Sequence, residues 1–223
     1  MIDQEFNIKQ EVDKKDYGRF SIEPLDQGYG HTLGNSLRRV LLTSLKGAAV
    51  TKVKIDGVKH PFSTLPGLKE DIIQLLLNVK KIRVKLSGDK SVTGKLQKKG
   101  PAKISAKDIE ISDAEVVNPD LYLGELTSNR AKLNMELTIE PGYGYVMADE
   151  KEKDKEMHSI ILDSLFTPVS RVNYKVEATR VGRMTNLDKL VLEVWTDGTI
   201  APRSALKEAA KILVIYFNQI YEP

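Results

Sequence analysis

The chain has 223 residues, with 34 basic and 31 acidic side chains and a formal net charge of +3. A dedicated duplex-DNA-binding protein usually concentrates far more positive charge on one face, so overall charge does not demand a nucleic-acid partner. Hydrophobic residues make up 41% and charged residues 29%, which is ordinary for a soluble globular protein of one large or two small domains.

Neither a membrane anchor nor a targeting segment is predicted. Apolar runs stay well below the roughly 18 residues that a membrane helix needs, and the N-terminal segment MIDQEFNIKQEVDKKD is too polar and acidic for a secretory or transit peptide. The sequence contains no cysteine, which excludes disulfides and thiolate metal sites and is compatible with a reducing compartment. We therefore expect a cytoplasmic or organelle-encoded protein without a membrane partner.

Three helices are predicted. The first spans about 33–45, with Thr32 as its N-cap. The second lies in LKEDIIQLLLNVKK, residues 68–81, with Glu70 and Asp71 in its first turn. The third begins near Pro202, a favoured first-turn residue, and runs almost to the C-terminus.

Most of the remaining chain alternates apolar and polar residues, the period of half-buried strands. One such stretch, residues 82–96, is expected to form a hairpin that turns at Gly88-Asp89. The charged segment 147–158 is expected to be a solvated loop. The other predicted strands lie in 51–57, 132–146, 171–181 and 188–200. Strand runs interrupted by a few helices, without regular βαβ alternation, predict an α+β fold.

Gly28, Gly30 and Gly34 form a G-x-G-x-x-x-G pattern, one residue away from the dinucleotide-binding fingerprint. The segment before it is not a buried apolar strand, no βαβ unit follows, and the Gly-Lys-Ser/Thr ending of a P-loop is missing. The alternative interpretation is that these glycines form a tight turn that leads the chain into the first helix.

No catalytic residue, metal site or cofactor is predicted. His31, His60 and His158 lie far apart, and none has the i, i+4 spacing of a helical metal pair. The sequence has neither a G-x-S-x-G elbow nor a clustered Asp-x-Asp element for Mg²⁺. His31 could serve as a general base, or it could stabilise a turn or an interface.

The predicted helix 33–45 has two faces. Its core stripe consists of Leu33, Leu37, Val40, Leu41 and Ser44. The opposite stripe consists of Asn35, Arg38, Arg39 and Leu42. Arginine is favoured at interfaces because its planar fork makes bidentate contacts. The second stripe is therefore either a protein-contact surface or a basic solvated face with one stray leucine.

The C-terminal helix becomes apolar nearly all round over residues 212–217. A helix without a polar face must be covered on more than one side. A symmetric dimer would provide that cover, and deep burial within a single domain is the alternative.

Three long segments of the chain closely resemble the N-terminal region of the α subunit of bacterial and plastid RNA polymerase. They are SIEPLDQGYGHTLGNSLRRVLLTSLKGAAVTKVKIDGV, HPFSTLPGLKEDIIQLLLNVKKI and LFTPVSRVNYKVEATRVGRMTNLDKLVLEVWTDGTIAPRSALKEAAKIL. They occur in the family's order. The centre, about 90–133, and the charged loop near Lys151 match more loosely.

The resemblance implies two subdomains and a scaffolding role. Residues 1–46 plus 168–223 would form a dimerisation subdomain, an antiparallel sheet packed on two helices, and 47–167 a strand-rich subdomain inserted in sequence. The homodimer, formed through the first and last helices, would nucleate polymerase assembly. One copy would bind the β subunit and the other β′, which holds the catalytic Mg²⁺. The bacterial cytoplasm, in association with the nucleoid, or the plastid stroma is the implied location.

The resemblance also assigns contact residues. Those of the β subunit map to Gly30, His31, Thr32, Leu33, Gly34, Asn35, Arg38, Arg39 and Leu42. Lys80 falls where the family has a large-subunit contact, and Tyr29, Leu33 and Val40 fall on its dimer contacts. Leu213 and Phe217 are assigned to the dimer interface from helix periodicity and apolarity.

The family continues through a linker into a small C-terminal domain that binds promoter DNA, whereas this sequence ends at Pro223. We therefore expect no direct promoter binding from this chain. Two other functions stay open from the residues alone. The chain could be a dimeric nucleic-acid-binding module using Arg38, Arg39 and the Lys98-Lys99 region, or an enzyme with a dispersed site.

Overall fold

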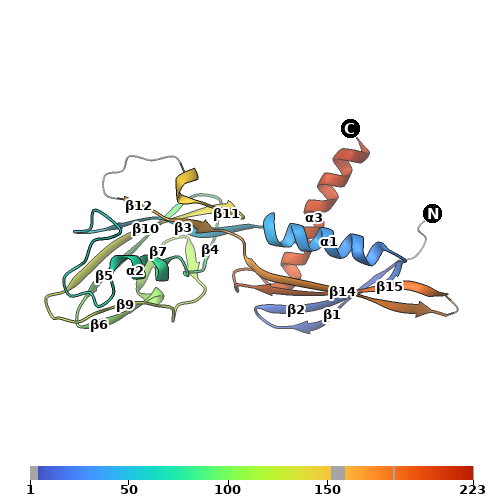
Figure 1. Ribbon diagram of the computed structural model, residues 1–223, viewed down its shortest axis with the longest axis horizontal. Coiled ribbons are helices and arrows are strands. Elements are labelled where there is room, and N and C mark those ends of the chain that lie inside the picture. The colour runs from blue at the N-terminus through green and yellow to red at the C-terminus, as the bar shows by residue number, and fades with distance from the viewer. Residues whose placement is uncertain (1–4, 152–158, 183, 223) are drawn as a thin grey trace. The chain divides into compact units, whose positions relative to one another are not determined.

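The computed structural model describes residues 5–151, 159–182 and 184–222 (Figure 1). Their contacts divide the chain into two compact units. The first comprises Met1–Leu45 and Thr167–Pro223, and the second comprises Lys46–Phe166. Both are built mainly from antiparallel strands with a few helices, which confirms the predicted α+β class.

The first unit is a four-stranded antiparallel sheet in the order β1-β2-β15-β14. Its strands are β1 (Asn7–Asp13), β2 (Tyr17–Asp26), β14 (Val169–Val181) and β15 (Met184–Thr196). Two helices, α1 (Tyr29–Thr43) and α3 (Pro202–Tyr221), contact this sheet and each other (Figure 1).

The core of this unit lies between the sheet and the two helices. Phe20 of β2 pairs with Leu192 of β15, which in turn pairs with Tyr174 of β14, so these side chains form one row across the sheet. Phe20 and Leu192 are almost completely buried. Leu37 and Leu41 of α1 belong to the same core cluster and fix α1 against the sheet.

The second unit contains a five-stranded antiparallel sheet in the order β12-β3-β10-β5-β7. Its strands are β12 (Ser159–Ile161), β3 (Lys46–Ile55), β10 (Lys132–Tyr143), β5 (Val92–Lys99) and β7 (Ile109–Ile111). Three two-stranded sheets accompany it, β11-β13, β4-β8 and β6-β9. Their strands are β11 (Tyr145–Val146), β13 (Ser164–Leu165), β4 (Val84–Leu86), β8 (Ala114–Val116), β6 (Ala102–Ser105) and β9 (Tyr122–Leu126).

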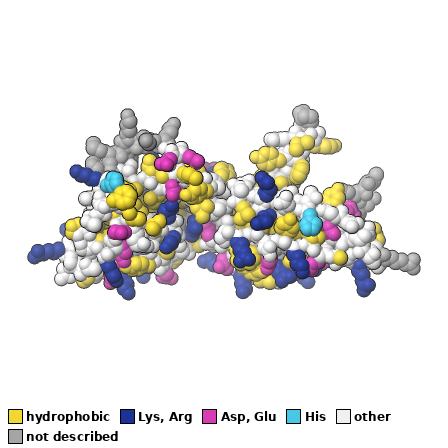
Figure 2. All heavy atoms as spheres, viewed as in Figure 1, with side chains coloured by type: hydrophobic (Ala, Val, Ile, Leu, Met, Phe, Trp, Pro, Cys, Tyr) yellow, Lys and Arg dark blue, Asp and Glu magenta, His cyan; other side chains and the backbone are white. Residues whose placement is uncertain are grey.

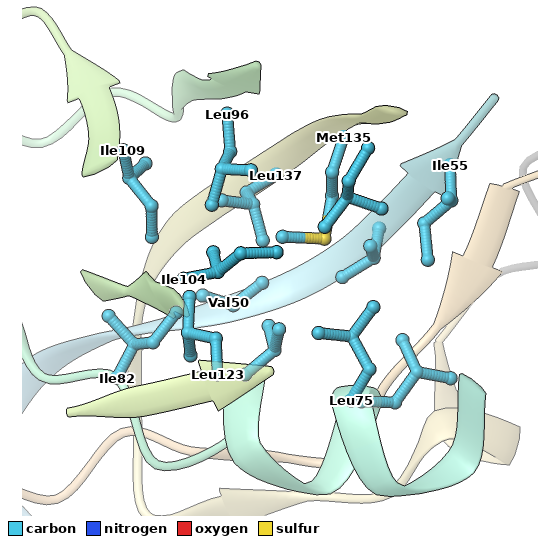
Figure 3. Packing of buried hydrophobic residues seen from close by; sticks show 14 of the residues in the cluster. Val50, Ile55, Leu75, Ile82, Leu96, Ile104, Ile109, Leu123, Met135 and Leu137 are labelled. Atoms are coloured by element: carbon cyan, nitrogen blue, oxygen red, sulfur yellow. The ribbon is translucent and has the colours of Figure 1, made fainter. Parts of the chain in front are cut away.

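The helix α2 (Ile72–Val79) covers the core of the second unit. Figure 3 shows Leu75 of this helix pointing toward Met135 and Leu137 of β10 and Val50 of β3. Two short 3₁₀ turns, Ala106–Asp108 and Ala148–Glu150, complete the described elements.

The prediction for the third helix is confirmed, whereas the predicted starts of the first two are wrong. The first helix begins at Tyr29, four residues before the expected Leu33, because Gly28 rather than Thr32 is its N-cap. The second begins at Ile72, and Asp71 is its N-cap, accepting a hydrogen bond of 2.8 Å from the backbone N of Gln74.

The predicted hairpin at 82–96 is also wrong. Strand β4 pairs with β8, and β5 pairs with β10 and β7. The alternation of apolar and polar residues identified both strands correctly. Their pairing partners, however, lie in distant segments of the chain, and turn residues between two strands do not predict such partners. Of the segment expected to be a charged loop, residues 152–158 lie outside the described residues. Within the described part of the chain, no helix is long and apolar enough to cross a membrane.

Candidate functional site

The N-terminus of α1 is held by a carboxylate from a distant strand. Gly28 has a backbone φ of 90°, in the left-handed region that favours glycine, and turns the chain into the helix. Asp188 of β15 accepts hydrogen bonds at its Oδ2 from the backbone N of Gly28 at 2.9 Å and of Gly30 at 3.2 Å. A negative charge at this position also complements the helix dipole. Asp188 is a positioning residue, and no local pattern in the sequence predicts this role.

Replacing Asp188 with alanine should lower the free energy of unfolding by about 1 kcal/mol, the usual cost of losing a helix cap. The loss should appear in urea or thermal unfolding. The matched control is Asp26→Ala, because Asp26 is exposed at the end of β2 and has no side-chain partner in the described residues. An equal effect of both substitutions would contradict the capping role of Asp188.

Gly30 and Gly34 are not part of a turn, unlike Gly28, which is the N-cap of α1. Gly30 and Gly34 lie within the helix on its buried face. A Cβ added at Gly30 would come within 2.7 Å of Cγ1 of Val176, and one at Gly34 within 2.6 Å of Cδ2 of Tyr174. The interpretation of these two residues as turn glycines is therefore wrong, since their role is to let the helix approach β14.

Three stripes on α1 each consist of four residues that lie four, three and four positions apart and therefore share one side of the helix. The inner stripe, which is buried, consists of Gly30, Gly34, Leu37 and Leu41. The outer stripe consists of His31, Asn35, Arg38 and Leu42. The flanking stripe consists of Tyr29, Leu33, Ser36 and Val40.

The outer stripe carries four of the nine predicted β-subunit contacts. His31, Asn35 and Arg38 are exposed, as are Thr32 and Arg39 beside them. Neither arginine forms an ion pair within the described residues, so both guanidinium groups are available to a partner. Figure 2 shows the mixture of basic and hydrophobic side chains on this part of the molecule.

Other predicted β-subunit contacts are less accessible. Gly30 and Gly34 face the sheet, so their contribution would be to position the helix. Leu42 is half-buried and packs at the edge of the core, so it is not the isolated exposed leucine that the sequence pattern indicates.

The flanking stripe and α3 carry the residues predicted for dimerisation. Leu33, Val40 and Leu213 are half-buried and pack along the edge of one hydrophobic core. Tyr29 is 46% exposed and Phe217 60% exposed. The structure thus brings apolar residues of both helices to the margin of the same core.

The second half of α3 is uncovered. Only its first half is buried, at Pro202, Ala205, Leu206 and Ala209. Large hydrophobic side chains follow that are exposed to solvent: Val214, Ile215, Tyr216, Phe217, Ile220 and Tyr221. Figure 2 shows hydrophobic side chains over the projecting end of this helix. Deep burial within a single domain, the alternative left open by the sequence, is therefore excluded for this segment.

Lys80, the predicted large-subunit contact, is the C-cap residue of α2 and already has a partner. Its Nζ lies 2.8 Å from Oδ2 of Asp163, whose Oδ1 accepts a hydrogen bond of 2.9 Å from the backbone N of Ala148. The hydrogen bond from Lys80, followed by that from Ala148, lowers the pKa of Asp163 from its ordinary value of 3.8. The ion pair with Asp163 therefore fixes the position of the Lys80 ammonium group, and the Lys80 side chain is only half-exposed.

Because folding lowers the pKa of Asp163, its stabilising contribution is present above the ordinary value of 3.8 and is lost as the pH falls below it. Between about pH 5 and about pH 2, the free energy of unfolding should fall less in Asp163→Asn than in the original chain. Urea titrations across this range measure the difference. Asp120→Asn, at an exposed loop position, is the control and should follow the original chain. Parallel curves for all three proteins would contradict the assignment.

Residues considered for other functions have structural partners. Nζ of Lys98 lies 2.6 Å from Oδ1 of Asp108, which reduces the charge available to a nucleic acid. The ring of His31 lies edge-on to that of Tyr174, with centroids 6.2 Å apart. Nδ1 of His60 accepts a hydrogen bond from the backbone N of Phe62. His158 lies outside the described residues, and the described residues contain no His, Cys, Asp or Glu cluster suited to a metal ion.

These features define a class: an α+β protein of two units whose candidate site consists of exposed apolar and basic surfaces on the helices α1 and α3. A family model described as the RNA polymerase Rpb3/RpoA insert domain matches residues 53–167. The chain is also similar to curated proteins named DNA-directed RNA polymerase subunit alpha. It is 50% identical over 207 residues to that of Roseiflexus sp. and 52% identical over 207 residues to that of Herpetosiphon aurantiacus.

A third relative with the same name, from Rubrobacter xylanophilus, is 46% identical over 219 residues. The alignments cover 92%, 92% and 97% of this chain but 64%, 62% and 69% of the respective relatives. The chain therefore belongs to the family of DNA-directed RNA polymerase α subunits and spans about two thirds of the length of these relatives.

Proposed function

We propose that the chain is the assembly part of an RNA polymerase α subunit, a non-catalytic homodimeric scaffold that binds the β and β′ subunits. Membership of the family supports this role. The observation that carries it is the set of separate stripes on α1. One faces the chain's own sheet, one presents apolar residues beside α3, and one presents the unpaired Arg38, with the unpaired Arg39 next to it.

The separation of these stripes allows dimerisation and subunit capture to occur together. The outer stripe, which includes Asn35 and Arg38, lies on a different side of α1 from the flanking stripe of Tyr29, Leu33 and Val40. A partner copy on the flanking stripe would leave Arg38 accessible, because it lies on the opposite side of the helix. In this proposal polymerisation chemistry belongs to other subunits, and the bacterial cytoplasm is the place of action.

Dimerisation is tested first by the molar mass of the isolated chain in light scattering. The chain has a mass of 25.0 kDa, and the proposal predicts a species of twice this mass. The exposed apolar half of α3 gives the physical reason, because burying it removes large hydrophobic side chains from water. A monodisperse monomer at micromolar concentration would contradict the proposal.

A further inference from the structure

The five-stranded sheet of the second unit has one face that α2 does not cover. Side chains of β5 and β10 alternate between the two faces. Leu96 and Met135 belong to the core on the α2 side, whereas Gln97 and Asn134, the next residue in one strand and the preceding one in the other, are exposed on the opposite face. Residues that lie opposite each other in the two strands therefore form rows across an open surface.

One of these rows consists of two lysines. Lys99 of β5 lies directly opposite Lys132 of β10, both are exposed, and neither forms an ion pair within the described residues. Like charges in this arrangement destabilise an antiparallel pair of strands. Lys95 and Lys98 of the same strand, in contrast, lie 3.7 Å and 2.6 Å from a carboxylate oxygen. An anion from outside the chain would relieve the repulsion between Lys99 and Lys132.

The neighbouring row adds a further donor. Gln97 is exposed, and its amide has no hydrogen-bond partner in the described part of the chain. Across from it, Nδ2 of Asn134 donates a hydrogen bond of 3.1 Å to Oδ2 of Asp56. These residues line a hollow of about 190 Å³, whose other carboxylate, that of Glu136, is paired with Lys95. Both carboxylates of the hollow are thus held by neighbours, while the Gln97 amide remains available as a donor.

The surroundings carry positive charge without apolar anchors. Residues 90–107 include six lysines and no acidic residue. Across residues 92–105 and 127–142, all of which the structure describes, no aromatic, leucine, isoleucine, valine or methionine side chain is exposed.

This composition favours one class of partner. Protein interfaces depend on buried aromatic and apolar anchors, and single-stranded nucleic acids are bound on aromatic stacking platforms. The backbone of duplex DNA requires only cations and hydrogen-bond donors. An exposed surface that offers lysines and an amide but no apolar anchor therefore fits duplex DNA better than the other two partners.

We propose that Lys99 and Lys132, together with the amide of Gln97, form a phosphate-binding site for the backbone of duplex DNA. The two ammonium groups come from opposite strands and converge on one phosphate. A backbone contact carries no sequence information, so this site is compatible with the absence of promoter recognition expected from the sequence. The inference goes beyond the proposed scaffold and depends neither on the dimer nor on the β subunit.

The test is fluorescence anisotropy of a labelled duplex of about 20 base pairs, titrated with the full chain at several salt concentrations from about 50 mM upward. The logarithm of the association constant should fall against the logarithm of salt concentration with a slope of about −1.8, because each lysine–phosphate contact contributes about −0.9. Lys99→Gln combined with Lys132→Gln should weaken binding about tenfold at the lowest salt and bring the slope close to zero. In urea this variant should be at least as stable as the original chain, because the opposed charges are gone.

Lys14→Gln combined with Lys15→Gln is the matched control. It removes the same charge from an exposed turn of the first unit and should leave the affinity within about twofold of the original. Equal losses in the two double variants would overturn the site in favour of a general effect of charge. The proposal also fails if the original chain does not bind the duplex at low salt, if a single strand of the same length binds more tightly, or if polyglutamate competes as well as unlabelled duplex.

Discussion

Replacing Arg39 with alanine is expected to weaken capture of the RNA polymerase β subunit by about 2–4 kcal/mol, provided that this arginine is at the centre of the contact. Arg39 is exposed on α1 and lacks an ion pair within the described residues. Its guanidinium group can therefore make bidentate hydrogen bonds to a partner without first breaking an internal one. Titration with purified β subunit measures the affinity.

The same variant should unfold and dimerise like the original chain, because no described side chain depends on the Arg39 guanidinium. Arg130→Ala is a suitable control, since Arg130 is also exposed and lacks a side-chain partner in the described residues, and it lies in the other unit. Unchanged β affinity in Arg39→Ala would sink the assignment of Arg39, whereas equal losses in both variants would indicate a general effect of charge.

Replacing Gly34 with valine is expected to lower the free energy of unfolding by about 3 kcal/mol through overpacking. A Cβ at this position would lie 2.6 Å from the ring of Tyr174 and 3.0 Å from Cδ1 of Leu190, so α1 or the strands beneath it must move. In a solvent-exposed helix the same change would be mildly favourable, because glycine is a poor helix former. The sign of the effect therefore reports the close approach of α1 to the sheet.

Asn35→Val is the control for this prediction. Asn35 is the next residue of the same helix and is exposed, so a new valine there meets solvent. Urea unfolding should show a small change for Asn35→Val and a large one for Gly34→Val. Similar stability of the two variants would mean that Gly34 is not a close-packing position.

Much of the fold could be predicted because the burial of one side of a strand or helix requires a periodic pattern of apolar residues in the sequence. The strand β14 alternates Val172, Tyr174 and Val176 with exposed Asn173 and Lys175, and Pro202 marks the first turn of α3. The exposed apolar end of α3 was foreseen from its lack of a polar face, which is a property of the segment alone.

The remaining features of the fold depend on contacts between residues that are far apart in the sequence, so no local pattern predicts them. The start of α1 at Tyr29 depends on the carboxylate of Asp188, which is 160 residues away from Gly28 in the sequence. The sequence pattern indicates that Gly30 is a turn residue, whereas in the structure it lies against Val176, where a Cβ would not fit. The partners of β4 and β5 likewise come from distant segments.

The candidate contact residues were likewise predictable only in part from the sequence. Periodicity placed Asn35, Arg38 and Arg39 on one side of the helix, and the structure leaves all three exposed. Periodicity could not show that Leu42 reaches the core edge or that Lys80 is paired with Asp163, since both depend on tertiary packing. Which partner covers the outer stripe is decided by binding experiments.

The central claim is that a dimer of this chain captures the β subunit. The most direct test is the molar mass, by light scattering, of the chain mixed with purified β subunit. The proposal predicts a complex of two copies of the chain and one β subunit, formed by the original chain and weakened in Arg39→Ala. A mixture in which the two proteins elute separately, each with the mass it has alone, would contradict the account.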